Sequence, residues 1–150
     1  MEDRKDIWVT DTVPPIDDIL ETFDLLDDWE DRYRFVIDLG RKLPPFPEAA
    51  RTEANRVRGC TSKVWFISET HGQPPVITFQ GDSDAHIVKG LIAILFSLYS
   101  GKSPQEILAI DAKATLGKLG LEGHLSPMRT NGLYAMVERI RAIAAEKAAA

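Results

Sequence analysis

One segment of the sequence, Gly90 to Tyr99 (GLIAILFSLY), is apolar almost all the way round at the spacing of a helix. It is too short to cross a bilayer, so other elements of the same chain have to bury its side chains. We therefore predict a central helix from about Ala85 to Ser100 that covers a sheet. The length of 150 residues favours a single domain with one core.

Helical patterns lie on both sides of this central segment. The predicted helices span residues 16–26, 29–43, 104–109 and 111–119, with a last one that begins at Ser126-Pro127. Ser103 to Glu106 has the form of a capping box with proline at the first helical position. Residues 1–13 show no such pattern, and we expect them to be frayed.

Between the second and the central helix, the pattern changes to that of strands. The predicted strands are Ala54–Arg58, Lys63–Glu69 and Val76–Phe79, separated by turn residues. Their order predicts a three-stranded antiparallel β-meander packed against helices, which is an α+β fold. Residues 59–62 would form the first hairpin loop, with Gly59 adopting a positive φ.

The distribution of charge and apolar residues excludes several classes of protein. The formal net charge is −5, with acidic residues concentrated in residues 1–38 and a slightly basic remainder. No basic residues cluster as nucleic-acid binding requires, so we expect none. The acidic part of the chain, residues 1–38, is either a solvated helix surface or a surface electrostatically complementary to a protein partner. With no apolar run behind the N-terminus and no membrane-spanning length, we expect a cytoplasmic protein without membrane contact.

Cys60 is the only cysteine of the chain and lies at or beside the predicted loop tip, in NRVRGCTSKVWF (residues 55–66). No internal disulfide can form, which suits a reducing compartment. Arg56, Arg58 and Lys63 are near in sequence, and nearby cations lower the pKa of a thiol and favour the nucleophilic thiolate. The alternative is a small apolar residue packed into the core. The local sequence leaves both readings open.

The remaining residue types offer little other chemistry. His71, His86 and His124 are dispersed and lack the local signature of a catalytic base, although His86 would be the best candidate base for a cysteine hydrolase. One cysteine and three scattered histidines do not make a metal site. Residues 81–84 (GDSD) lack the glycines of a phosphate-binding loop. We therefore expect neither a cofactor nor a metal.

Arg129 stands in the first turn of the predicted last helix, where the helix dipole disfavours a cation. An exposed guanidinium in water tolerates that position at little cost. The functional alternative is that Arg129 binds an anionic group, in this protein or in a partner.

Separated blocks of the sequence also form a pattern when taken together. They are NRVRGCTSKVW (55–65), QGDSDA (80–85), IVKGL (87–91), and GL (120–121), LSPMR (125–129) and GL (132–133) with Met136. In this order and near this spacing they resemble the SufE family, which includes CsdE. The resemblance covers about residues 14 to 145.

The resemblance implies a sulfur acceptor, not an enzyme, with a fold shared with IscU-type scaffolds. SufE-like proteins take persulfide sulfur from a PLP-dependent cysteine desulfurase of the SufS or CsdA type, stimulate that desulfurase, and pass the sulfur to an iron–sulfur scaffold such as SufB or to another acceptor. The motif places the acceptor at Cys60. Arg129 matches the family's arginine that is linked to the desulfurase interaction, and Asp84 matches the family's aspartate after Gly-Asp-Ser. We expect Arg129, Asp84, Gly59 and Lys63 to contribute to partner binding. No cofactor of its own is implied, and a monomer suffices.

The chain departs from the family pattern beside the thiol, where Thr61 and Lys63 stand at positions commonly held by glutamine. We expect Cys60 to be partly shielded at rest by apolar neighbours, because it lies beside Val64 and Trp65, and to swing out when a partner docks. Two rival functions remain: a cysteine-dependent hydrolase, and a pure interaction module in which the thiol is structural.

Overall fold

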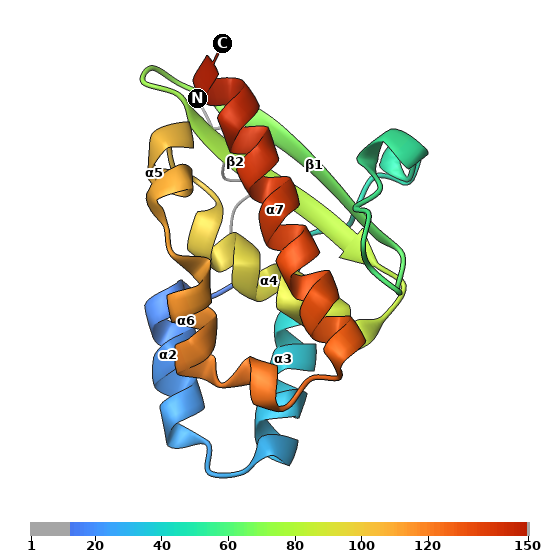
Figure 1. Ribbon diagram of the computed structural model, residues 1–150, viewed down its shortest axis with the longest axis vertical. Helices are drawn as coiled ribbons and strands as arrows, with labels where there is room; N and C mark the ends of the chain where they lie inside the picture. The colour runs from blue at the N-terminus through green and yellow to red at the C-terminus, as the bar shows by residue number, and fades with distance from the viewer. Residues whose placement is uncertain (1–12, 150) are drawn as a thin grey trace.

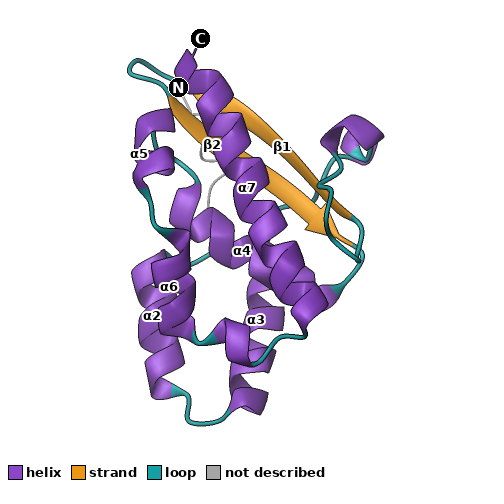
Figure 2. Cartoon of the chain, in the orientation of Figure 1, coloured by secondary structure: helices purple, strands orange, loops and turns teal. Residues whose placement is uncertain are grey.

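The computed structural model describes residues 13–149, which form an α+β fold (Figure 1). Its α-helices are α2 (Ile16–Leu25), α3 (Trp29–Arg41), α4 (His86–Tyr99), α5 (Pro104–Ala109), α6 (Ala112–Leu119) and α7 (Pro127–Ala149), and its strands are β1 (Val64–His71) and β2 (Val76–Ser83). The frayed segment expected at residues 1–13 lies outside the described residues except at Val13, which is buried rather than frayed. The two strands form one antiparallel ribbon, and helices supply the rest of the core (Figure 2).

The central helix is confirmed as α4. Ile92, Ala93, Ile94 and Leu95 have no exposed surface, so four consecutive side chains pointing in different directions are all covered. The helix packs against β2, α2, α3 and α7. Within residues 13–149, no helix is long and apolar enough to cross a membrane.

A close approach between α3 and α4 fixes how these two helices cross. A Cβ added to Gly90 would lie 2.1 Å from the carbonyl oxygen of Val36, and one added to Gly40 would lie 2.6 Å from the backbone nitrogen of Gly90. Neither site has room for a side chain, because the neighbouring atoms belong to the backbone. Glycine at both positions therefore lets the helix backbones touch.

The predicted three-stranded meander is wrong, because only its second and third strands form. β1 and β2 pair from Val64↔Ser83 to His71↔Val76. Before them, residues 53–55 form a 3₁₀ turn, where the side-chain amide of Asn55 donates to the carbonyl oxygen of Ala50 at 2.9 Å. Such side-chain bonds compete with strand pairing, and the segment keeps one isolated bridge, Arg56↔Trp65.

β2 extends to Ser83, beyond the predicted end at Phe79, and this moves the start of α4 away from residues 81–83. Gly81, Asp82 and Ser83 continue β2 and pair with β1. The cap residue of α4 is Ala85, and no side chain caps it. The carboxylate of Asp84 is consequently not part of the helix start and is available to the loop beside it.

The caps of the later helices lie where the sequence predicts them. Ser103 and Glu106 form the reciprocal capping box at the start of α5. The carboxylate of Asp111 caps α6, and Ser126 Oγ accepts a hydrogen bond of 3.2 Å from the backbone N–H of Arg129 at the start of α7. The Ser126 cap fixes where α7 begins, and hence which residues of α7 face the loop that carries Cys60.

The glycine contact between α3 and α4 predicts the effect of a single methyl group. Gly90→Ala should lower the free energy of unfolding by about 3 kcal/mol or more, because overpacking against a backbone carbonyl cannot relax through a flexible side chain. Gly117→Ala in α6 is the matched control, since no atom lies within 4 Å of the added Cβ. That variant should stay within about 1 kcal/mol of the parent or gain stability. Urea unfolding measures both, and equal values for the two variants would contradict the close approach.

Candidate functional site

The candidate site is built around Cys60, in the loop that leads into β1. The backbone N–H of Val57 donates to the carbonyl oxygen of Val64 at 2.9 Å and closes the loop. Gly59 has a φ of 88°, as predicted, and a Cβ there would lie 3.0 Å from the Cβ of Ala135 in α7. Glycine is therefore required at position 59 by backbone conformation and by contact with α7.

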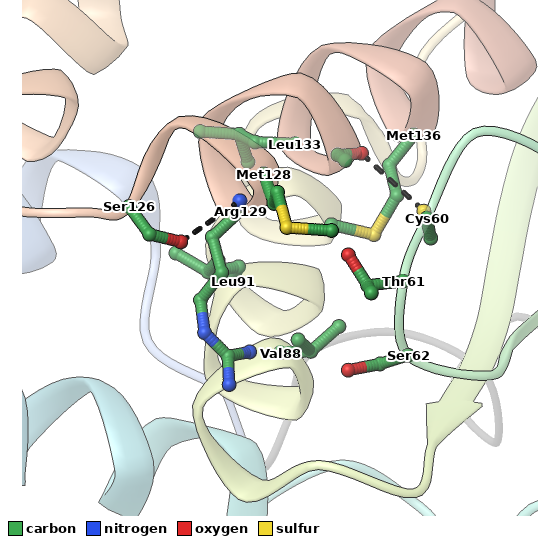
Figure 3. Close-up of a pocket in the computed structure, with 11 residues that line it drawn as sticks. Cys60, Thr61, Ser62, Val88, Leu91, Ser126, Met128, Arg129, Leu133 and Met136 are labelled. Atoms are coloured by element: carbon green, nitrogen blue, oxygen red, sulfur yellow. Dashed lines mark hydrogen bonds between the residues drawn. The ribbon is translucent and has the colours of Figure 1, made fainter.

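Cys60 lies at the edge of a cavity of about 270 Å³ between its loop and two helices. The lining residues are Cys60, Thr61 and Ser62 from the loop, Val88 and Leu91 from α4, and Ser126, Met128, Arg129, Gly132, Leu133 and Met136 from the start of α7. In the view of Figure 3, the side chains of Met128 and Met136 lie between Arg129 and Cys60. The thiol thus faces a largely apolar wall.

The thiol is half-buried against α7. Cys60 Sγ donates a weak hydrogen bond of 3.5 Å to the carbonyl oxygen of Gly132 (Figure 3). A Cβ at Gly132 would lie 3.6 Å from that sulfur, which is ordinary van der Waals contact, so the loop packs closely on the helix here. The shielding that we expected from Val64 and Trp65 comes instead from α4 and α7, since neither Val64 nor Trp65 lines the cavity.

Burial outweighs the neighbouring positive charge at the thiol. Desolvation raises the pKa of Cys60 above its usual value, and the guanidinium of Arg56 opposes this only in part. Arg58 pairs with Glu53 at 2.9 Å and does not contribute, and neither does Lys63. Of the three cations near Cys60 in sequence, only Arg56 lowers the pKa of the thiol, because sequence proximity does not place the charges of Arg58 and Lys63 beside the sulfur.

The other predicted site residues take up different places. Arg129 lines the cavity, and among the described residues its guanidinium has no acidic partner within ion-pair distance. Asp84 is exposed and braces the end of the loop: Asp84 Oδ1 accepts from the backbone N–H of Lys63 at 3.0 Å. The side chain of Lys63 is exposed and does not line the cavity. The structure thus brings Arg129 and Cys60 to one cavity, with Gly59, Lys63 and Asp84 around the loop.

The histidines lie elsewhere, and none lines the cavity within the described part of the chain. His71 is hydrogen-bonded to Thr78 at the far end of the sheet, and the ring of His124 stacks on Trp29 at 3.7 Å. His86 is exposed at the start of α4. In residues 13–149, no group of three His, Cys, Asp or Glu side chains is placed to hold a metal ion.

Local sequence reasoning singled out the loop but not the α7 wall that it rests on, although residues of that wall stand in the blocks that carry the family resemblance. Met128, Gly132 and Met136 recur every four residues along α7, a spacing that puts them on one helix face. That spacing, together with a glycine in the middle, is a readable signal for a surface that another backbone approaches. No comparable signal marks Arg139, which contacts the same loop from the next turn of α7.

Comparisons with known proteins agree with one another. Residues 17–144 match the model of the SufE family, described as an Fe-S metabolism associated domain. An uncharacterized SufE-like protein of Rhizobium etli is 53% identical over 137 residues, which cover 90% of this chain and 93% of that protein. A second, from Rhizobium meliloti, is 51% identical over 128 residues, which cover 84% of this chain and 91% of that protein. The solution structure of a hypothetical protein from Thermus thermophilus superposes with a TM-score of 0.72 at 26% identity, covering 92% of this chain and 99% of that one.

The raised pKa of Cys60 predicts a pH profile for its alkylation. Only the thiolate reacts, so at a given pH the native protein should react more slowly than a peptide of residues 55–66 that carries the same neighbours in sequence. The rate in the native protein should also reach half its maximum at a higher pH than the rate in the peptide. Iodoacetamide labelling followed by mass spectrometry measures both, and an inflection at lower pH in the native protein would contradict the dominance of burial.

Proposed function

The chain belongs to the SufE family, whose domain is associated with Fe–S metabolism, and on this premise we propose that it is a sulfur acceptor that carries persulfide sulfur on Cys60. Its donor is a PLP-dependent cysteine desulfurase of the SufS or CsdA type, whose turnover it stimulates by removing the persulfide. Its downstream partner is an iron–sulfur scaffold such as SufB or another acceptor. The protein acts in the cytoplasm as an accessory protein rather than as a free-standing enzyme.

The proposed step is a transpersulfidation. The thiolate of Cys60 attacks the outer sulfur of the desulfurase persulfide, an S–S bond forms on Cys60, and the original S–S bond breaks. The desulfurase cysteine leaves as a thiolate, and the proton of the Cys60 thiol is lost to solvent before the attack. No external oxidant or reductant is needed, because one S–S bond replaces another. A second cysteine beside Cys60 would convert the carried persulfide into a disulfide, and the chain has none.

One observation carries the proposal: the chain's single thiol lies at the edge of an apolar cavity whose described lining holds no base or metal ligand set. A carrier needs a thiol, shelter for a reactive sulfur, and a loop that can present it. A cysteine hydrolase needs a histidine within hydrogen-bond reach, and the histidines line no part of this cavity. A structural cysteine would not need a cavity beside it.

Two side chains next to the cavity suit a protein partner. Met128 is 60% exposed, although large apolar side chains are usually covered. Arg129 follows it, with a guanidinium that lacks an acidic partner among the described residues. An apolar contact beside such a cation fits a docking surface with a complementary acidic group. On docking, the Cys60 loop would leave α7, and the pKa of the thiol would fall as desolvation is relieved.

The proposal predicts a covalent adduct on one residue. Incubation with a cysteine desulfurase, PLP and cysteine should add the mass of one sulfur atom to the protein, and peptide mapping should place it on Cys60. Cys60→Ser should gain no sulfur and should no longer stimulate the desulfurase, while binding of the desulfurase persists. If several desulfurases of the SufS and CsdA types gave no adduct on the parent protein, the carrier role would be wrong.

Replacement of the histidines separates a carrier from a hydrolase. The triple variant His71→Gln, His86→Gln and His124→Gln should still accept sulfur at close to the parent rate, because the Cys60 thiol loses its proton to solvent and needs no histidine as base. Thermal unfolding should accompany the assay, since His71 and His124 make packing contacts. A folded triple variant that had lost sulfur acceptance would favour a catalytic histidine.

A further inference from the structure

The base of the Cys60 loop is closed by the hydrogen bond of 2.9 Å from Val57 N to the carbonyl oxygen of Val64. Two further contacts hold its ends. At its exit, Asp84 and Lys63 exchange two hydrogen bonds: Lys63 N donates to Asp84 Oδ1 at 3.0 Å, and Asp84 N donates to the carbonyl oxygen of Lys63 at 3.3 Å. Because these two residues adjoin β1 and β2, this end of the loop is an extension of the sheet. It does not tie the loop to α7.

At the entrance of the loop, the tie runs to α7 and is made by Arg139. Its Nη2 donates to the carbonyl oxygen of Ala54 at 2.9 Å, and its Nη1 donates to the carbonyl oxygen of Arg56 at 3.2 Å. The two guanidinium nitrogens thus bind two carbonyl oxygens, two residues apart, of one backbone segment. A planar, always charged fork of this kind is specific to arginine, and hydrogen bonds from a charged donor are stronger than those between neutral groups.

Between these ends, the loop is held to α7 only weakly. Among the described residues, one hydrogen bond joins residues 58–62 to α7, from Cys60 Sγ to Gly132 at 3.5 Å. A thiol is a poor donor, and this bond disappears when the thiol ionises or receives sulfur. The bond from the thiol therefore cannot by itself decide whether Cys60 rests in the cavity or outside it.

We propose that Arg139 is the positioning residue that holds the entrance of the Cys60 loop on α7 and so sets how much of the time the sulfur lies in the cavity. This inference rests on the proposed function, because a carrier has to shelter its sulfur between two partners and therefore needs its loop held. The guanidinium reaches the loop through backbone carbonyls, so it acts whatever Cys60 carries. Without Arg139, the segment four residues before the thiol loses its tie to α7 and keeps its pairing with β1, at Arg56↔Trp65 and from Val57 N to the carbonyl oxygen of Val64.

The test is the exposure of the thiol in Arg139→Ala. Without the fork, the loop should leave the cavity more often, and alkylation of Cys60 near neutral pH should become about tenfold faster, the size expected for the loss of charge-assisted hydrogen bonds from an opening equilibrium. The inflection of the alkylation profile should move to lower pH, because the desolvation that raises the pKa of Cys60 is relieved. Arg139→Lys keeps the charge but lacks the fork, so its rate should fall between those of the parent and Arg139→Ala.

Arg141→Ala is the matched control. Arg141 lies two residues further along α7, and its Nη1 donates to the carbonyl oxygen of Leu108 at the end of α5, at 3.0 Å. The same change therefore removes a similar side-chain-to-backbone bond that does not touch the Cys60 loop. Urea unfolding of both variants corrects for loss of global stability. Arg141→Ala should leave the alkylation rate and its pH profile at parent values.

The outcomes separate this inference from the function that it rests on. Equal alkylation rates and inflections in Arg139→Ala, Arg141→Ala and the parent would overturn the role of Arg139. A rise in both variants that follows their urea midpoints would overturn it too, because general loosening would then explain the exposure. Faster alkylation in Arg139→Ala alone supports it, even if no desulfurase loads Cys60, in which case only the carrier function fails.

Discussion

Because α4 carries apolar side chains almost all round, the fold has to cover it from several sides. The sheet covers it through β2, α3 crosses it at Gly40 and Gly90, and α7 contributes a further side. Where α7 meets α4, the covering is incomplete, and Val88 and Leu91 form the floor of the cavity. The site is thus a gap between elements placed by the core, filled in part by the Cys60 loop.

The balance of desolvation and charge at Cys60 is compatible with the carrier role that we propose for this thiol. In the cavity, burial raises the pKa of the thiol and keeps the reactive thiolate scarce. Arg56 is close enough to moderate that effect but not to reverse it. In the proposed function, a partner that draws the loop into water would lower the pKa of the thiol and so restore its reactivity. The contacts at the loop are few: Val57 with Val64, Asp84 with Lys63, Cys60 with Gly132, and Arg139 with the preceding segment.

The parts predictable from sequence are those whose signals are local. The apolar helix, the capping box at Ser103, the start of α7 at Ser126 and the positive φ of Gly59 each depend on a few adjacent residues, and all are present. The first predicted strand, Ala54–Arg58, was wrong because the amide of Asn55 turns the backbone before the segment can pair. The walls of the cavity and the grip of Arg139 join residues more than 70 positions apart, so no local pattern could assign them.

The measurement that tests the account most directly is a single turnover with labelled sulfur. A desulfurase is loaded with radiolabelled persulfide, freed of cysteine, and mixed with an equal amount of this protein. The account predicts that the label leaves the desulfurase and appears in the peptide that contains Cys60, at no more than one sulfur per chain, and that it remains resistant to dilute reductant longer than in the isolated peptide. Label that stays on the desulfurase, or that reaches this protein equally well when Cys60 is replaced by serine, would contradict the account.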